Sequence, residues 1–305
     1  MSTPLPSITR GLELTEEQQM IRDSVREFAR DVVAPVAHDI DEEHRFPKDV
    51  WDQIVELGLP GIPFSEEVGG SEGGTLAYAL AVEELAKVCG STALTYAAHV
   101  SLGTYPIYRW GGDKLCSLYV PKLVAGEYMG AYGLTEPNAG SDSGGTQTTA
   151  VLDGDEYVLN GRKCFITNAN HAGVFIVTAV TDRSLGSKGI SAFVVPRETA
   201  GFSLEKGERK LGMRGSDWAS LVFEDARIPR DHLLGPEGEG FKTFMKTLEG
   251  GRISIAALSL GLAEGAFEES VRYAQEREAF GGTLSDQQAV QFKLADMAEI
   301  GRAHV

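Results

Sequence analysis

The sequence lacks the features that mark membrane proteins and disulfide-stabilised secreted proteins. Its three cysteines, Cys89, Cys116 and Cys164, are far apart and form no CxxC pair, so we expect reduced thiols rather than a disulfide framework or a metal site. No apolar stretch approaches the roughly 20 residues that a membrane-spanning helix needs. The first residues have neither an apolar signal core nor an arginine-rich amphipathic pattern. These absences predict a cytoplasmic protein with no membrane partner.

Basic residues are also scarce. Acidic residues outnumber them by 44 to 28, and the formal net charge is −16. Such a chain repels nucleic acid at long range, so we expect no nucleic-acid partner. A small cofactor that carries phosphates remains compatible with this charge, because local amides, hydroxyls and single arginines hold such ligands.

The motifs of the commonest nucleotide and metal folds are missing as well. The sequence contains no GxGxxG, no GK dipeptide and no HExxH. Residues 69–73 match the GxSxG pattern around Ser71, but the pattern requires a preceding strand and none is predicted there. A glycine-rich surface loop is therefore favoured, and a serine hydrolase is kept as the competing class.

Residues 1–127 have the periodicity of an all-α domain. Thr15 and Gln18 form a capping box, and the helix that follows is expected to stop at Pro35. Pro47 begins a second helix and Gly58 ends it. Apolar residues at helical spacing predict further helices over 75–87, 93–110 and 114–124.

Residues 128–238 change to the period of strands. The dipeptides Asp153-Gly154 and Asn160-Gly161 predict two hairpin turns. Three more β-rich runs follow at 174–180, 190–195 and 219–223. Because no helix between these runs is long enough for a parallel crossover, we expect a compact antiparallel barrel or sandwich.

Residues 239–305 return to the helical period. One helix is predicted over 240–280, and after Gly281-Gly282 a capping pair, Ser285 with Gln288, opens another that carries Val290, Leu294 and Met297. Two facing helices leave apolar surface uncovered, so this part resembles half of a bundle that needs more chain or a partner subunit. The predicted fold class is α+β with three domains, the last incomplete.

Two segments of the middle domain are candidates for binding a ligand. Residues 132–142 combine small residues, which let a backbone approach a ligand, with the hydroxyls of Thr135 and Ser141. Such a loop suits a flat polar ligand with phosphates, although an ordinary wide turn would have a similar composition. Phe165 and Thr167 share one face of a strand, and cross-strand packing is the alternative explanation for them.

These segments together resemble the acyl-CoA dehydrogenase family. The likeness rests on TEPNAGSD at 135–142, FITN at 165–168, ERKLGMRGSD at 208–217 and VFEDARIP at 222–229. It continues through GEGFK at 238–242, GGRISIAALSLGLAEGAF at 250–267 and REAFGGTLSDQQAVQFKLADMA at 277–298. The resemblance implies FAD as cofactor, an acyl-CoA as substrate, and electron-transfer flavoprotein or a similar acceptor as partner.

The resemblance also assigns roles to residues. The positions expected to line FAD are Tyr132, Leu134, Thr135, Ser141, Phe165 and Thr167, with Ser141 also near the thioester. Many relatives have tryptophan in place of Phe165, so a stacking face is kept and an indole donor is lost. The positions expected to reach the FAD of a neighbouring subunit are Arg277, Phe280, Gln287 and Gln288, which implies a homotetramer or dimer. Arg277 suits a pyrophosphate, whereas a cation at a helix end facing water is its ordinary role.

The substrate residues and the base complete these expectations. Glu249 and Arg252 match positions that contact acyl-CoA or support the active-site wall, and Arg252 could equally be a structural ion-pair partner. In the family a glutamate removes the α-proton while a hydride passes from the β-carbon to the flavin N5. That glutamate is expected beyond Val305, or in a minority of relatives at the position of Gly251, while Glu249 points about 200° away from that direction. The alternative is a homologue that binds flavin or acyl-CoA as a subunit or scaffold without catalysis.

Overall fold

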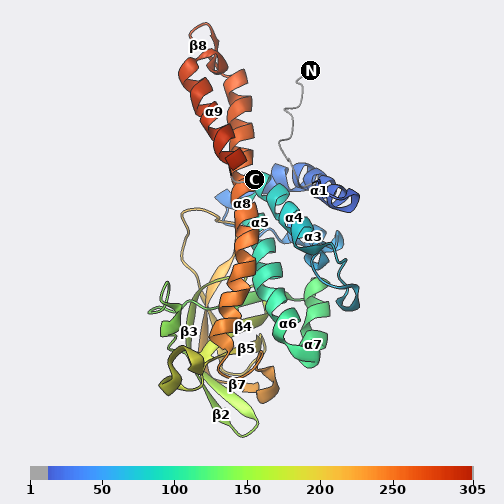
Figure 1. The fold of residues 1–305 in the computed structure, drawn as a ribbon. Helices are drawn as coiled ribbons and strands as arrows, with labels where there is room; N and C mark the ends of the chain where they lie inside the picture. The colour runs from blue at the N-terminus through green and yellow to red at the C-terminus, as the bar shows by residue number, and fades with distance from the viewer. Residues whose placement is uncertain (1–12, 304–305) are drawn as a thin grey trace.

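The computed structural model describes residues 13–303, so the predicted absence of a targeting segment at the chain start falls largely outside the described part. Its N-terminal part, up to Val124, is helical (Figure 1). The helices are α1 (Glu16–Phe28), α2 (Ala34–Glu42), α3 (Lys48–Glu56), α4 (Gly74–Val88), α5 (Gly90–Ala98), α6 (Tyr105–Trp110) and α7 (Gly112–Val124). The capping box of Thr15 and Gln18 is present at the start of α1.

The prediction that the first helix stops at Pro35 is wrong. A π-helical turn, η1 (Ala29–Val33), joins α1 to α2 without a break. Pro35 lies in the first turn of α2, directly after the π-helical turn, so the ladder of hydrogen bonds that its missing N–H interrupts is already irregular there.

The helix predicted over 93–110 contains a second π-helical turn, η4 (His99–Thr104). There Gly103 lies so close to the first strand that a Cβ atom on it would be 2.6 Å from the carbonyl carbon of Gly130. The buried His99 side chain connects η4 to the first strand and to α7. Its Nδ1 accepts from the Gly130 N–H at 3.1 Å, and its Nε2 lies 3.1 Å from the Leu123 carbonyl. Sequence periodicity does not reveal such an approach.

The middle of the chain forms a seven-stranded curled sheet. Its strands are β1 (Met129–Gly133), β2 (Thr149–Asp153), β3 (Glu156–Thr167), β4 (Ala172–Val180), β5 (Ile190–Pro196), β6 (Phe202–Lys206) and β7 (Trp218–Pro229). The order is β1-β4-β2-β3-β7-β6, and β5 pairs with β4. The sheet is mixed rather than wholly antiparallel, because β1 and β4 are parallel. The crossover between them contains β2 and β3 instead of a helix, which the rule of helical crossovers did not anticipate.

Only one of the two predicted hairpin turns exists. Asp153-Gly154 connects β2 to β3 as expected. Asn160-Gly161 lies inside β3, at a bulge where the register against β7 shifts after Leu159. Gly161 has φ 148°, and a Cβ atom there would lie 2.5 Å from the Thr148 Oγ1. A glycine is therefore needed at 161 for close packing against Thr148 rather than for a turn.

The last part is one long helix with a hairpin and a second helix. α8 (Gly240–Glu276) runs along the molecule from the sheet to beyond the N-terminal helices, and β8 (Glu278–Ala279), β9 (Gly282–Thr283) and α9 (Gln288–Ala303) fold back along it (Figure 1). The capping pair is Thr283 with Asp286, around the turn at 284–286, rather than Ser285 with Gln288. Large apolar side chains are exposed along this part: Ile253, Ile255, Leu262, Tyr273, Phe280, Phe292 and Ile300.

The three-part α+β fold class is confirmed. Helices, curled sheet and helices follow one another in the predicted order. Within residues 13–303, no helix is both long and apolar enough to cross a membrane.

Candidate functional site

A cavity of about 290 Å³ lies where the sheet meets the helices. It is lined by Ala98 and Leu102 from α5 and η4, Leu248 from α8, Ala131 and Tyr132 from β1, Leu134 and Thr135 from the loop after β1, and Phe165, Ile166 and Thr167 from β3. Five of the predicted flavin residues therefore gather around one space, although they come from two separate segments.

The direction of Phe165 depends on an irregularity in β3. The register against β7 shifts between Lys163 and Ile166, and Phe165 has φ 62°, in the left-handed region that a bulky residue rarely adopts. The side chain is 67% exposed, and its ring lies 5.2 Å from that of Trp218. The bulge thus holds an aromatic face at the cavity instead of in the core.

Tyr132 connects the cavity to α8. Its ring stacks on Phe244 with centroids 4.2 Å apart, and its hydroxyl donates to the Phe244 carbonyl at 3.0 Å. Burial raises the pKa of the Tyr132 phenol well above its ordinary value, so this group stays neutral and structural.

The cavity lining suits the ring system of a flavin. The hydroxyls of Thr135 and Thr167 border the cavity and make no hydrogen bond to another described side chain or backbone group. The remaining lining is apolar or aromatic, and no acidic or basic side chain among the described residues borders the space. A planar group with polar edges could stack on Phe165 and use both hydroxyls.

Ser141 is a predicted flavin residue that does not line this cavity. It is exposed in the loop between β1 and β2. Its expected contacts with FAD and thioester therefore stay predictions.

The substrate candidates lie on α8 beside the cavity. Glu249 and Arg252 are exposed, and neither makes an ion pair with another residue in the 13–303 range. Gly251 is buried, and a Cβ atom on it would lie 3.2 Å from Cδ2 of Leu102, which lines the cavity. A side chain at 251 would thus point toward the cavity wall.

The four residues expected to serve a neighbouring subunit lie at the far end of α8. Arg277 and Gln288 are exposed, Gln287 is half-buried, and Phe280 is 95% exposed. At about 1.5 Å per residue, the helix from Leu248 to Arg277 spans about 44 Å. Within one chain these residues are close to one another and far from the cavity.

Sequence reasoning missed the polar residues that support this cavity. Lys163, two residues before Phe165, is completely buried and pairs with the buried Glu136. Trp218 was missed too, and it borders an open cavity of about 590 Å³ that Phe46, Lys206 and Arg209 also line. A lysine at an inward position of the run RKCFIT was the available signal.

Comparisons with known proteins agree with this architecture. Residues 15–127 match the family model of the acyl-CoA dehydrogenase N-terminal domain, residues 131–226 match the middle domain, and residues 238–304 match the C-terminal domain.

Individual relatives cover most of the chain. A probable acyl-CoA dehydrogenase of Bacillus subtilis is 53% identical over 94% of this chain and 76% of its own length. A short-chain-specific acyl-CoA dehydrogenase of Clostridium acetobutylicum is 51% identical over 93% of this chain and 75% of its own length.

Solved structures share the fold. Butyryl-CoA dehydrogenase of Megasphaera elsdenii superposes with a TM-score of 0.93 at 43% identity, over 96% of this chain and 77% of that one. An acyl-CoA dehydrogenase of Bacillus anthracis complexed with FAD has a TM-score of 0.90 at 36% identity, over 96% of this chain and 50% of that one.

These findings define a dehydrogenase of the three-domain flavoprotein class. The chain belongs to the acyl-CoA dehydrogenase family, an FAD-dependent family of oxidoreductases.

Proposed function

We propose that this protein holds FAD in the cavity between β1, β3 and α8 and takes part in the α,β-dehydrogenation of a short-chain acyl-CoA. The observation that carries the proposal is the convergence of Thr135, Phe165 and Thr167 on one cavity from two segments. The short-chain preference is supported by relatives named as short-chain-specific and butyryl-CoA dehydrogenases.

The residues of the cavity would bind and orient the reactants. Phe165 offers a stacking face, and the hydroxyls of Thr135 and Thr167 can hydrogen-bond the polar edge of an isoalloxazine. Ser141 is proposed to reach both FAD and thioester from its loop, and Glu249 and Arg252 to meet the CoA side of the substrate. When bound, FAD supplies at N5 the acceptor for the hydride that leaves the β-carbon.

Proton removal is the step for which the described residues offer no group. A base must contact the α-carbon, and no carboxylate borders the cavity within residues 13–303. The second candidate is a homologue that binds flavin and acyl-CoA without turning over. Gly251 is the position where the family's alternative glutamate would stand, beside Leu102.

The electron acceptor is proposed to be electron-transfer flavoprotein or a similar protein. Phe165 lies against Trp218, and Trp218 borders the open cavity of about 590 Å³ at the surface. One structure that superposes with a TM-score of 0.94 at 48% identity is described as the electron transferring flavoprotein of Acidaminococcus fermentans.

Assembly and location complete the proposal. Arg277, Phe280, Gln287 and Gln288 are proposed to contact the FAD of a second subunit in a homotetramer or dimer, because their own cavity is about 44 Å away along α8. The cytoplasm is the proposed location, and fatty-acid metabolism the proposed context.

Anaerobic mixing with butyryl-CoA tests this function. The FAD-loaded protein should bind butyryl-CoA, with a shift in its flavin spectrum, but bleach at least about 100-fold more slowly than typical enzymes, because a general base contributes about 10² to 10⁴ in rate. Gly251→Glu should accelerate bleaching, whereas the matched Gly251→Gln should not. Rapid bleaching of the unchanged protein would show that it does have a base in contact with the α-carbon. Failure to bind butyryl-CoA at all would contradict the proposed substrate.

A further inference from the structure

The two halves of the cavity are not held together by the strand ladder. Leu134 and Thr135 follow β1, while Phe165 and Thr167 belong to β3. In the sheet order β1-β4-β2-β3, two strands separate β1 from β3. Something other than sheet pairing must set the distance between the segments.

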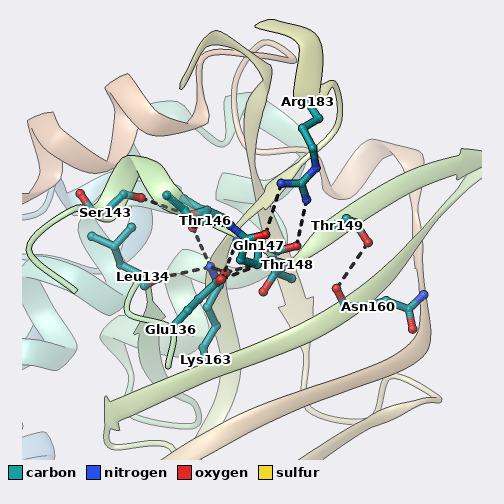
Figure 2. Close-up of polar contacts among 12 residues, drawn as sticks. Leu134, Glu136, Ser143, Thr146, Gln147, Thr148, Thr149, Asn160, Lys163 and Arg183 are labelled. Carbon is teal, nitrogen blue, oxygen red and sulfur yellow. Dashed lines mark hydrogen bonds and ion pairs between the residues drawn. The ribbon is translucent and has the colours of Figure 1, made fainter. Parts of the chain in front are cut away.

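Lys163 bridges this gap from inside the sheet. Its side chain is completely buried, and its Nζ donates to the Leu134 carbonyl at 3.2 Å and to Glu136 Oε1 at 2.7 Å (Figure 2). It also donates to Thr178 Oγ1 at 2.9 Å. An ammonium has three donors and no acceptor. Each donor thus has a partner, and two of the three partners belong to the cavity loop.

The adjacent backbone makes the same connection. The N–H of Cys164 donates to the Thr135 carbonyl at 2.8 Å. Residues 163 and 164 of β3 therefore hydrogen-bond to residues 134–136, immediately before Phe165 at the bulge.

Glu136 extends the connection to the other end of the loop. Its Oε2 accepts from the Gln147 N–H at 2.6 Å, and its Oε1 accepts from the Thr148 N–H at 3.1 Å (Figure 2). Its backbone exchanges hydrogen bonds of 3.0 and 3.1 Å with Ala139, which closes the turn at Pro137-Asn138. One carboxylate thus fixes where the loop leaves β1 and where it enters β2.

The electrostatics keep this pair ionised. Burial lowers the pKa of the Lys163 ammonium to about 8, against the opposing effect of Glu136. Burial alone would raise the pKa of Glu136, but Lys163 and the hydrogen bonds from 147 and 148 lower it. Removing one partner alone would leave a buried charge without compensation, which is strongly destabilising.

We propose that Lys163, together with Glu136, is a positioning residue for the flavin, setting the Thr135 loop against Phe165 and Thr167 without touching the ligand. The proposal rests on the proposed FAD site. Lys163 does not line the cavity, so its effect passes through Leu134, Thr135 and the bulge of β3.

The test replaces the charged pair by a neutral pair of similar shape. Lys163→Met with Glu136→Gln leaves no uncompensated buried charge, and such replacements are often neutral for stability. We expect FAD affinity to weaken by roughly 10-fold to 100-fold, as when a partner of a metal ligand is removed, and the flavin spectrum and midpoint potential to shift at saturating FAD. The urea midpoint of the FAD-loaded protein should fall with the affinity, because FAD stabilises only the folded chain.

A matched pair elsewhere provides the control. The half-buried Lys87 and the buried Glu84 form an ion pair of 3.3 Å on α4, away from the cavity. Lys87→Met with Glu84→Gln should leave FAD affinity, flavin spectrum and potential unchanged, although it also takes a partner from Arg26 and one from Glu264 of α8.

A second variant removes one contact without a charge. Thr178→Val deletes one acceptor of the Lys163 ammonium and keeps the side-chain shape, so it should fold and should shift the flavin spectrum in the same direction by a smaller amount. If Thr178→Val and the Lys163/Glu136 double variant both keep the FAD affinity and flavin spectrum of the wild type, Lys163 does not position the flavin. The proposed FAD site would be unaffected by that result. A wild-type protein that takes up no FAD would instead overturn the proposed function, and this inference with it.

Discussion

At the scale of single residues, the cavity hydroxyls make the sharpest expectation. Thr135→Val with Thr167→Val keeps the shape of both side chains and removes both hydroxyls from the lining. Since a hydrogen bond contributes about 1 kcal/mol and 1.4 kcal/mol is tenfold in affinity, we expect FAD to bind at least about tenfold more weakly by fluorescence titration. Thr149→Val on β2, away from the cavity, is the control, and equal affinities in all three proteins would refute the assignment.

His99 should make stability depend on pH. Burial lowers its pKa to about 4 from an ordinary value near 6.5. Its ring contacts Trp51, the Leu123 carbonyl and the Gly130 amide, none of which carries a charge. Below about pH 6.5 the unfolded chain is protonated at His99, whereas the folded chain becomes protonated there only near pH 4. The free energy of unfolding therefore falls by up to about 3 kcal/mol as the pH is lowered from about 6.5 to about 4.

A glutamine at 99 isolates this contribution. His99→Gln can still donate to one partner and accept from the other, but it does not titrate. In urea unfolding at pH 7 and pH 4.5, wild type should lose more free energy of unfolding than His99→Gln. Equal losses would mean that His99 has an ordinary pKa.

Which residues the sequence could reveal depended on the kind of signal. Thr135, Phe165 and Thr167 stood in motifs that resemble a known family, and the structure brings them together. Lys163 stands at an inward position of RKCFIT and Glu136 lies within TEPNAGSD, but neither position predicts an ion pair, because a lysine in a strand and a glutamate in a loop ordinarily face water. Their burial depends on contacts between segments that only the folded chain defines.

At the scale of elements, the crossing of α4 and α8 is set by glycines. A Cβ atom on Gly265 would lie 2.1 Å from the Lys87 carbonyl oxygen, and one on Gly261 would lie 2.3 Å from the Glu83 carbonyl oxygen. Gly265→Ala should therefore lower the free energy of unfolding by about 1–3 kcal/mol through overpacking.

Another glycine of the same helix provides the comparison. Gly250 has open space where a Cβ would stand, so Gly250→Ala should raise the free energy of unfolding by about 0.5–1 kcal/mol through helix propensity. Denaturant unfolding of both variants checks the pair. A stabilising Gly265→Ala would show that the two helices do not approach so closely.

Elements that follow periodicity were predictable, and the irregular ones were not. The helices and most strands appear where their apolar spacing placed them. The π-turn at 99–104, the bulge at Asn160-Gly161 and the parallel pairing of β1 with β4 all depend on contacts with distant segments, such as Gly103 against Gly130. Local sequence carries little of that information.

At the scale of the whole molecule, the four residues at the end of α8 predict a shared site. Arg277→Ala should weaken FAD binding although Arg277 is about 44 Å from its own cavity along the helix. A mixed oligomer distinguishes an Arg277 that contacts the FAD of a neighbouring subunit from an Arg277 that contacts the FAD of its own subunit. If Arg277 serves a neighbour, co-assembly of Arg277→Ala subunits with Thr135→Val/Thr167→Val subunits creates some sites in which neither defect is present.

The mixed sample should therefore recover part of the flavin that each variant alone fails to retain, measured by absorbance after gel filtration. If each subunit used its own Arg277, every site would carry one defect and no recovery would occur. A monomer that still retains FAD tightly would also exclude the shared site.

The flavin content of the purified protein decides whether the cavity is what we assign it to be. The account predicts a yellow protein that releases stoichiometric FAD on denaturation, and whose bound FAD is largely lost in Thr135→Val/Thr167→Val. A colourless protein that takes up no FAD when the cofactor is added in excess would contradict the account.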